Sequence, residues 1–495
     1  MQDGSDCKEV KERQSTDDDA DNEAESSRLE QRLREVRQRW LGDASSQGIA
    51  DEDDIESIYW DLYNRTQSRL HPSIECIHES AGGRLALLLL QRSCSDPKES
   101  SSASPQKRQR REHTADGILR ELGYHCRLAS NIFDYAGEDN SQALGIAQSN
   151  ESSSAVASRS IPCRIFDDAL TVNQLRSLQN VFSDPQASYW SVHNYQVEPP
   201  SPYFSYVVPL KENGESSFDH LPADFGSLGS CIHAILRLLE DWKPNVTKQA
   251  NYCEMWAHNR PGVTGHQLHF DSDNEGKSCT ASTSSTTRGA HQDDNHFQST
   301  AGANVKHPLI TAIVYLTGVG GPTLVTNQRL ASQRVADRGW LAYPRTNRLV
   351  LMDGRVLHCV IPGKRSTGKP YSSHRVDCES SFMPTRDGRR RVSVMLAFWK
   401  RLRVRDEGFP GAARPLPAHS QRRSNDSCNA VAIPTWASDL VAPLPRDADR
   451  DEVHCVPDRS EIDPICLSRV YETLDSGLWT REMGIPAYDQ VFQGI

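Results

Sequence analysis

The stretch GHQLHFD at residues 265–271 decides how the rest of the chain is interpreted. Its residue pattern predicts a strand over 267–271. Side chains at positions i and i+2 of a strand point to the same face, so His269 and Asp271 can direct an imidazole and a carboxylate toward one point. Alone, this H-x-D motif is weak, because the chain contains 17 histidines and a single histidine is more often an ordinary surface or core residue.

A second histidine lies far along the chain, in the stretch LVLMDGRVLH at residues 349–358. The pattern predicts an apolar strand, a tight turn and a following strand that carries His358. Two histidines and one carboxylate form the facial triad that binds Fe(II) in non-haem oxygenases and leaves coordination positions open for a co-substrate and dioxygen. We therefore predict that His269, Asp271 and His358 bind a metal.

A third stretch, RRRVSVMLAFW at residues 389–399, predicts a strand in which Arg391 and Ser393 share one face. In an otherwise apolar barrel this arginine needs an anionic partner, because an unpaired buried guanidinium is costly. A dicarboxylate co-substrate would supply one, since the planar guanidinium binds a carboxylate through two hydrogen bonds. Arg389 lies on the same face, so either arginine is a candidate anchor. The alternative is an edge strand whose arginines pair with surface acids.

Six other histidines compete as metal ligands. His266 lies three residues before His269 in the same predicted strand, so we expect it to face the other side. The remaining ones are interpreted as solvated loop histidines. The competing residues are His258, His266, His291, His296, His307 and His374. The chain contains no P-loop, G-x-S-x-G or H-E-x-x-H motif, which removes the usual support for phosphoryl transfer, serine hydrolysis and zincin chemistry.

Short strand patterns with glycine and proline between them surround these motifs and predict a sandwich or barrel. Helical periodicity is predicted before and after this region. The predicted strands are 161–166, 252–257, 267–271, 309–316, 323–326, 340–343, 348–352, 356–361 and 391–399. The predicted helices are 29–40, 55–70, 85–94, 118–133, a helix after Thr171, 228–242 and 465–479.

Composition divides the chain into three regions. Residues 1–160 are an acidic N-terminal region, partly disordered (1–28, a linker at 95–114 and a Ser-rich boundary at 138–160) and partly helical. Residues 161–400 are the predicted catalytic domain, with loop insertions near 272–306 and 363–388. Residues 401–495 are a C-terminal extension.

Charge and hydropathy exclude several classes. The net charge of −10 argues against a general nucleic-acid binder. No run of about 18 apolar residues predicts a membrane span, and the polar N-terminus predicts an intracellular, cytoplasmic protein. The basic cluster KRQRR at 107–111 would direct nuclear import, although such a run is more often a solvated charge run. The 13 cysteines contain no C-x-x-C pair, which disfavours a disulfide framework or a structural zinc site.

The order H-x-D, distal His, then R-x-S resembles the 2-oxoglutarate/Fe(II)-dependent dioxygenase superfamily, over roughly residues 161–400. The stretches 264–271, 310–317, 320–324 and 353–362 resemble its prolyl-4-hydroxylase-like branch. This resemblance implies a chain that is mainly β with flanking helices, around a double-stranded β-helix (jelly-roll, cupin-like) catalytic core.

The same resemblance implies a function and a set of site residues. His269, Asp271 and His358 would bind Fe(II), and Arg391 would bind the far carboxylate of 2-oxoglutarate, helped by Ser393 and Tyr315. The co-substrates would be 2-oxoglutarate and dioxygen, with ascorbate as an optional reductant. The reaction would release succinate and CO₂ and hydroxylate a C–H bond. The substrate, a peptide or protein side chain or a small molecule, is left open.

Two other classes of function are considered. One is a non-catalytic β-barrel scaffold whose N-terminal helices and acidic tail bind partners. The other is a cupin-like metal enzyme that does not use 2-oxoglutarate, in which Arg391 has no role. A 2-oxoglutarate consumption assay beside a metal-binding measurement separates the three hypotheses.

Overall fold

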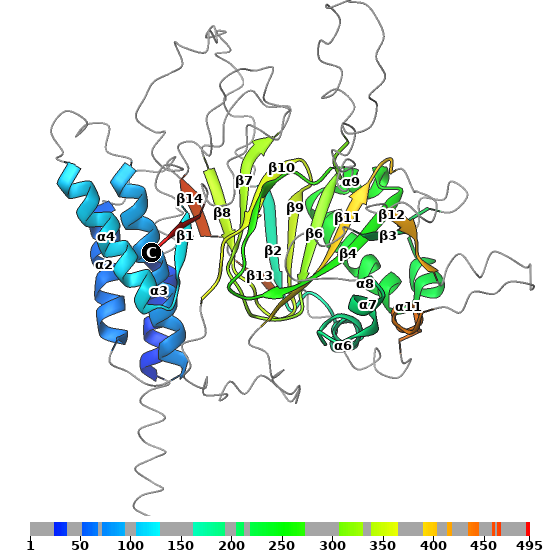
Figure 1. The fold of residues 1–495 in the computed structure, drawn as a ribbon, viewed down its shortest axis with the longest axis horizontal. Coiled ribbons are helices and arrows are strands. Elements are labelled where there is room, and N and C mark those ends of the chain that lie inside the picture. The colour runs from blue at the N-terminus through cyan, green and yellow to red at the C-terminus, as the bar shows by residue number, and fades with distance from the viewer. Residues whose placement is uncertain are drawn as a thin grey trace, which may run out of the picture.

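We describe the protein from a computed structural model of the 495-residue chain. Two sheets occupy the centre, with a helical bundle beside one and a second group of helices against the other (Figure 1). The described residues are 24–36, 52–67, 72–94, 105–128, 162–193, 204–211, 218–272, 306–329, 338–364, 390–402, 413–417, 434–444, 458–460, 463–466 and 492–495.

The larger sheet has eight strands in the order β12-β3-β4-β11-β6-β9-β2-β13. Its pairs are antiparallel except β12 with β3. The strands are β2 (Cys163–Asp167), β3 (Ser205–Pro209), β4 (Tyr252–Pro261), β6 (Ile310–Tyr315), β9 (Arg348–Asp353), β11 (Arg390–Trp399), β12 (Ala413–Pro415) and β13 (Asp458–Ser460).

The smaller sheet has five antiparallel strands in the order β14-β8-β7-β10-β5. The two sheets pack face to face, because Ile165 and Tyr315 of the larger sheet share one buried cluster with Val325 and Trp340 of the smaller. The strands are β5 (His266–His269), β7 (Thr323–Arg329), β8 (Arg338–Ala342), β10 (Val356–Val360) and β14 (Asp463–Cys466).

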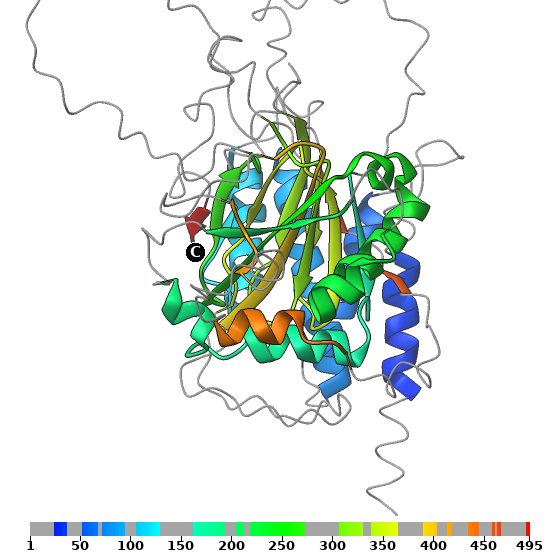
Figure 2. The same cartoon turned by 90° about the vertical axis from the view of Figure 1, so that its right-hand side faces the viewer.

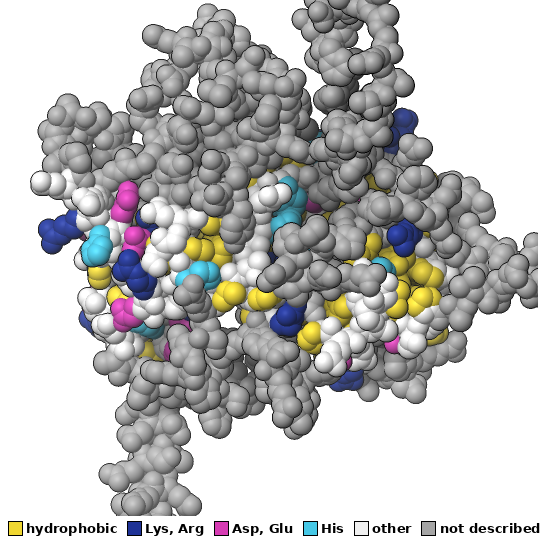
Figure 3. Space-filling model, viewed as in Figure 1, with side chains coloured by type: hydrophobic (Ala, Val, Ile, Leu, Met, Phe, Trp, Pro, Cys, Tyr) yellow, Lys and Arg dark blue, Asp and Glu magenta, His cyan; other side chains and the backbone are white. Residues whose placement is uncertain are grey.

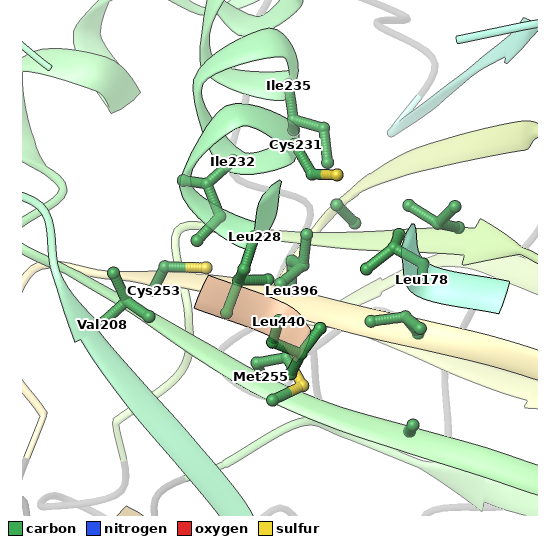
Figure 4. Packing of buried hydrophobic residues seen from close by; sticks show 14 of the residues in the cluster. Leu178, Val208, Leu228, Cys231, Ile232, Ile235, Cys253, Met255, Leu396 and Leu440 are labelled. Carbon is green, nitrogen blue, oxygen red and sulfur yellow. The ribbon is translucent and has the colours of Figure 1, made fainter. Parts of the chain in front are cut away.

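Helices cover the outer face of the larger sheet (Figure 2). Their apolar side chains pack on residues such as Met255 and Leu396 and form the largest buried cluster (Figure 4). An added Cβ on Gly226, which has a φ of +53°, would lie 2.1 Å from the Val441 carbonyl oxygen, so glycine lets α11 seat against α8. The helices are α6 (Val172–Phe182), α7 (Ser188–Val192), α8 (Leu221–Trp242), α9 (Pro244–Gln249) and α11 (Thr435–Val441).

The N-terminal helices form a bundle with its own buried cluster, beside the smaller sheet (Figure 1). Lys364, just after β10, links the bundle to the sheets: its Nζ lies 2.7 Å from Glu79 Oε1 and 5.4 Å from the ring centroid of Tyr124. The bundle contains a helix over 24–36, α2 (Glu52–Thr66), α3 (Pro72–Cys94) and α4 (Pro105–Glu121), followed by β1 (Cys126–Leu128), which pairs with β15 (Phe492–Gly494).

The structure corrects the sequence analysis in this bundle. The predicted linker at 95–114 is wrong from Pro105 onward, because α4 begins there and carries the basic cluster 107–111. Ala115, Ile118 and Leu122 are buried in the bundle, so tertiary packing stabilises a helix whose composition is mostly polar. The predicted disorder over 1–28 is also wrong for 24–28, which are helical.

Two predicted helices have bounds that differ from the structure, one at its end and one at its start. The helix predicted over 118–133 ends at Glu121, because Gly123 adopts a φ of 89°. There the Tyr124 amide donates to the Leu119 carbonyl, which closes the helix. The helix predicted over 465–479 is wrong at its start, since Ile465 and Cys466 belong to β14 and pair with β8; its remainder lies outside the described residues.

The structure is sheet-rich with flanking helices, as predicted, and the central strands lie where the sequence placed them, with bounds shifted by a few residues. The predictions for 138–160 and for most of both loop insertions fall outside the described residues. The division at residues 160 and 400 stays a prediction. Within the described ranges, no helix combines the length and apolar character that crossing a bilayer requires.

Candidate metal centre

The three predicted metal-binding residues come together between the two sheets. His269 is the last residue of β5, and Asp271 follows two residues later. His358 lies on β10, where it is the register partner of His269. The Oδ1 atom of Asp271 is 3.7 Å from His269 Nε2 and 3.6 Å from His358 Nε2. All three ligand atoms lie within 4.8 Å of one another, so one ion can contact all of them. On the face shown in Figure 3, histidine side chains reach the surface over the sheets.

Both imidazoles are held with Nε2 toward the site. His269 Nδ1 lies 2.9 Å from the Gln267 carbonyl oxygen, and His358 Nδ1 lies 3.0 Å from that of Val356. A carbonyl oxygen only accepts hydrogen bonds, so each Nδ1 carries the hydrogen and donates it. The lone pair of each neutral ring is therefore on Nε2, which is the atom that faces Asp271.

Asp271 is oriented by a neighbouring strand. The Thr311 hydroxyl donates to Asp271 Oδ2 over 2.6 Å, which leaves Oδ1 directed at the imidazoles. His307 Nδ1 lies 2.6 Å from the backbone carbonyl oxygen of Asp271 and donates to it. A carboxylate fixed in this way presents one oxygen to a metal without needing to reorganise.

The electrostatics of the site favour a neutral imidazole at His269. Burial, and then the neighbouring His358, lowers the pKa of His269 to about 4. Asp271 and His358 are buried as well. A divalent ion binds histidine only in its neutral form, so this histidine is prepared for a metal at neutral pH without first losing a proton.

Arg391 forms a second polar group in the interior. It is 7% exposed, and its terminal nitrogen donates to Thr323 Oγ1 over 2.9 Å and to Tyr315 Oη over 3.4 Å. Its guanidinium carbon lies 5.3 Å from the Tyr315 ring centroid. Within the described residues its buried Nε has no hydrogen-bond partner. A guanidinium with an unused donor in an apolar interior is suited to an anion.

The turn before β7 makes room for this arginine. Gly320 has a φ of 107°, and an added Cβ there would lie 2.9 Å from Cδ of Arg391. Ser393 is 1% exposed and is the register partner of Tyr315 on one side and of His258 on the other. Arg389, the other candidate anchor, lies outside the described residues.

The prediction that His266 faces away from His269 is wrong, since the two ring centroids are 4.5 Å apart. On β10 the step from His358 to Val360 is two residues, whereas on β5 the paired step from His269 to His266 is three. This irregularity in the pairing brings both rings to one side. His258 lies 6.0 Å from His266, ring centroid to ring centroid.

His307, predicted to be a solvated loop histidine, is instead half-buried and supports Asp271. His291, His296 and His374 lie outside the described residues. Two threonines at the site were missed by the sequence analysis. Thr311 precedes Tyr315 by four residues in β6, so the two share a face, and the site role that the resemblance implied for Tyr315 could have pointed to Thr311 as well. Thr323 carried no comparable signal.

No family model and no curated protein matches the sequence. Among solved structures, the chain is similar to a prolyl-4-hydroxylase from Pseudomonas putida, with 13% identity over 48% of this chain and 89% of that chain, at a TM-score of 0.25. It is similar to a 2OG-Fe(II) oxygenase family oxidoreductase from Burkholderia pseudomallei, with 9% identity over 52% and 90% of the two chains, at a TM-score of 0.24.

A third similar structure is HygX from Streptomyces hygroscopicus with nickel, 2-oxoglutarate and hygromycin B bound. It shares 10% identity over 51% of this chain and 92% of that chain, at a TM-score of 0.24. The identities and TM-scores are low, so the function proposed below rests on the geometry of the site.

Proposed function

We propose that the protein is an Fe(II)- and 2-oxoglutarate-dependent dioxygenase that hydroxylates a C–H bond and releases succinate and CO₂. One observation carries this proposal. Two imidazoles and a carboxylate converge within 4.8 Å, in the same interior that holds an arginine with an unused donor. A metal site with three protein ligands leaves positions open for a co-substrate and dioxygen.

The order of strands supports a double-stranded β-helix. Along the chain, β4, β6, β9 and β11 belong to the larger sheet, and β5, β7, β8 and β10 belong to the smaller. In space they run β4-β11-β6-β9 and β5-β10-β7-β8, so the chain crosses repeatedly between the sheets. Eight strands in two facing sheets connected in this way make a jelly roll.

In the proposed site, His269, Asp271 and His358 would hold Fe(II), and the bound ion would supply the activation of dioxygen. Arg391 would bind the far carboxylate of 2-oxoglutarate, assisted by Tyr315 and Ser393. Thr311 keeps Asp271 turned toward the ion. Val325, the register partner of His358, belongs to a buried apolar cluster next to the proposed site. The substrate would be a peptide side chain or a small molecule.

The test is an assay of 2-oxoglutarate turnover run beside an Fe(II) titration. We expect succinate release that depends on Fe(II) and is stimulated by at least one member of a panel of peptides and metabolites. Metal binding without any 2-oxoglutarate consumption would favour a cupin-like enzyme of another kind. No metal binding at all would favour a non-catalytic scaffold. Arg391→Gln should abolish succinate release and leave Fe(II) binding intact.

A further inference from the structure

Two arginines lie directly opposite each other on β4 and β11. Arg260 on β4 is the register partner of Arg391 on β11. Directly opposed residues of an antiparallel pair share a face. This face is the inner one, because Val392, which follows Arg391, points the other way and packs in the cluster under the helices. Like charges directly opposite each other destabilise a sheet, so this pair calls for negative charge nearby.

The two side chains serve different parts of the interior. Arg391 extends toward Thr323 and Tyr315, on the side of β6 and β7. Arg260 lies two residues beyond His258 on β4, so the two share the inner face, and the His258 ring is 6.0 Å from that of His266 on β5, centroid to centroid. The ring of His266 lies 4.5 Å, centroid to centroid, from that of the proposed ligand His269. The two arginines therefore face different groups: Arg260 lies on the side of the proposed metal site, whereas Arg391 extends toward Thr323 and Tyr315.

The charge of Arg260 is not balanced by the described residues around it. It is half-buried, and within the described part of the chain it makes no ion pair or hydrogen bond with a carboxylate. Asp271, the carboxylate nearest the imidazoles, contacts both of them and accepts a hydrogen bond from Thr311. A half-buried guanidinium without an anion costs stability that a bound anion would restore.

We propose that Arg260 binds an anionic group, a carboxylate or a phosphate, of the primary substrate. This inference rests on the proposed function, because it takes Arg391 as occupied by 2-oxoglutarate. The substrate class is then narrowed to anionic molecules, or to peptides with an acidic side chain near the hydroxylated carbon.

The first experiment measures thermal stability of the full chain, once in EDTA and once with Fe(II) and 2-oxoglutarate under anaerobic conditions. Inorganic phosphate and acetate are the probes. We expect either probe to raise the Tm of the wild type, and the apparent affinity for it to fall by roughly ten- to a hundredfold in Arg260→Gln. Which probe acts at lower concentration distinguishes phosphate from carboxylate.

Arg401→Gln is the matched control, because Arg401 is an exposed arginine just beyond β11; it should respond to the probes as the wild type does. Without added anion, Arg260→Gln should keep or raise the Tm, since it removes one of two opposed charges. A fall in Tm larger than that of Arg401→Gln would mean that Arg260 has a partner within the chain, and would overturn the inference. Equal probe affinity in Arg260→Gln and the wild type would overturn it as well.

The second experiment uses turnover. Acyl amino acids and sugar phosphates are each tested beside the matching amide or unphosphorylated sugar, with succinate release as the readout. We expect the charged member of an active pair to be preferred, and Arg260→Gln to remove that preference. Equal stimulation by neutral members would contradict the inference. Absence of any succinate would count against the proposed function alone, because the stability measurements in EDTA decide the role of Arg260 without it.

Discussion

The Thr311 hydroxyl donates a hydrogen bond of 2.6 Å to Oδ2 of Asp271, across from β6 to the segment that follows β5. This contact decides which oxygen of the carboxylate faces His269 and His358, since Oδ1 is the atom close to both Nε2 atoms. A residue outside the proposed ligand set thereby controls the geometry of the set.

Thr311→Val should weaken Fe(II) binding about tenfold or more while the chain stays folded, because the substitution keeps the shape of the side chain and removes the hydroxyl that orients Asp271. Anaerobic Fe(II) titration measures the change. Thr326→Val is the matched control: its hydroxyl donates to the Leu357 carbonyl, and it is likewise buried. Equal Fe(II) affinity in Thr311→Val and the wild type would contradict the orienting role.

Arg391→Lys should raise the KM for 2-oxoglutarate by about one to two decades, with Fe(II) affinity unchanged. Lysine keeps the charge but loses the planar set of donors that Thr323, Tyr315 and the proposed carboxylate share. Steady-state kinetics at varied 2-oxoglutarate measures it. Arg389→Lys is the control. A large effect at Arg389 with none at Arg391 would mean that Arg389, and not Arg391, binds the far carboxylate of 2-oxoglutarate.

Asp353→Asn should destabilise the fold by about 1.5–3 kcal/mol, because it removes a buried carboxylate that pairs with three partly exposed cations. Asp353 Oδ2 lies 2.7 Å from Arg329, 2.8 Å from Arg355 and 3.4 Å from Lys243. Burial alone would raise the pKa of Asp353, but these cations outweigh it and lower the pKa to about 2. Chemical denaturation measures the change.

Asp168→Asn is the matched control for that measurement. Its side chain is 72% exposed, and its contact with Arg345 is long, at 3.9 Å. Exposed ion pairs contribute little to stability, so we expect a change below about 0.5 kcal/mol. Comparable losses of unfolding free energy in the two variants would mean that the buried Asp353 contributes no more to stability than an exposed aspartate does.

Stability should decrease as the pH falls from about 6.5 toward 4, in part because of His193. Burial lowers the pKa of His193 to about 4 in the folded chain, whereas an unfolded histidine has a pKa near 6.5. The unfolded chain therefore binds the extra proton throughout that window, and its uptake favours unfolding. In the folded chain the His193 ring stacks on Phe204, with 3.9 Å between the ring centroids, and its Nε2 forms a hydrogen bond with the Tyr206 hydroxyl.

Denaturation curves at a series of pH values measure this effect, and His193→Gln should flatten the dependence between pH 6.5 and 4. The corresponding substitution at His113, an exposed histidine of α4, should leave the dependence unchanged. A wild-type profile that is flat over this window would show that His193 titrates normally in the folded chain.

The sequence predicted the site best where the two-residue period of a strand determines which face a side chain occupies. The i, i+2 spacing of His269 and Asp271, and of Arg391 and Ser393, already placed each pair on one face. The same period gave the wrong face for His266. The extra residue in β5 appears only when β5 is paired with β10, so the sequence of β5 alone does not reveal it.

The first turns of α4 were missed for a related reason. This polar segment is helical because Ala115, Ile118 and Leu122 pack into the bundle, and that packing depends on partners distant in the chain. Thr323 was missed as a site residue because only the fold brings it against Arg391. Pairings between distant strands, rather than the residues within one strand, set these features.

The central claim is that His269, Asp271 and His358 hold an iron ion that is used with 2-oxoglutarate. Its most direct test is anaerobic Fe(II) titration of the wild type, His269→Ala and His266→Ala, followed by admission of oxygen with 2-oxoglutarate and measurement of succinate. His266 is the matched control, because its ring contacts that of His269 yet lies outside the proposed ligand set. We expect His269→Ala to lose both iron binding and succinate release, and His266→Ala to bind iron as the wild type does. If His269→Ala bound iron as tightly as the wild type, His269 would not be a ligand.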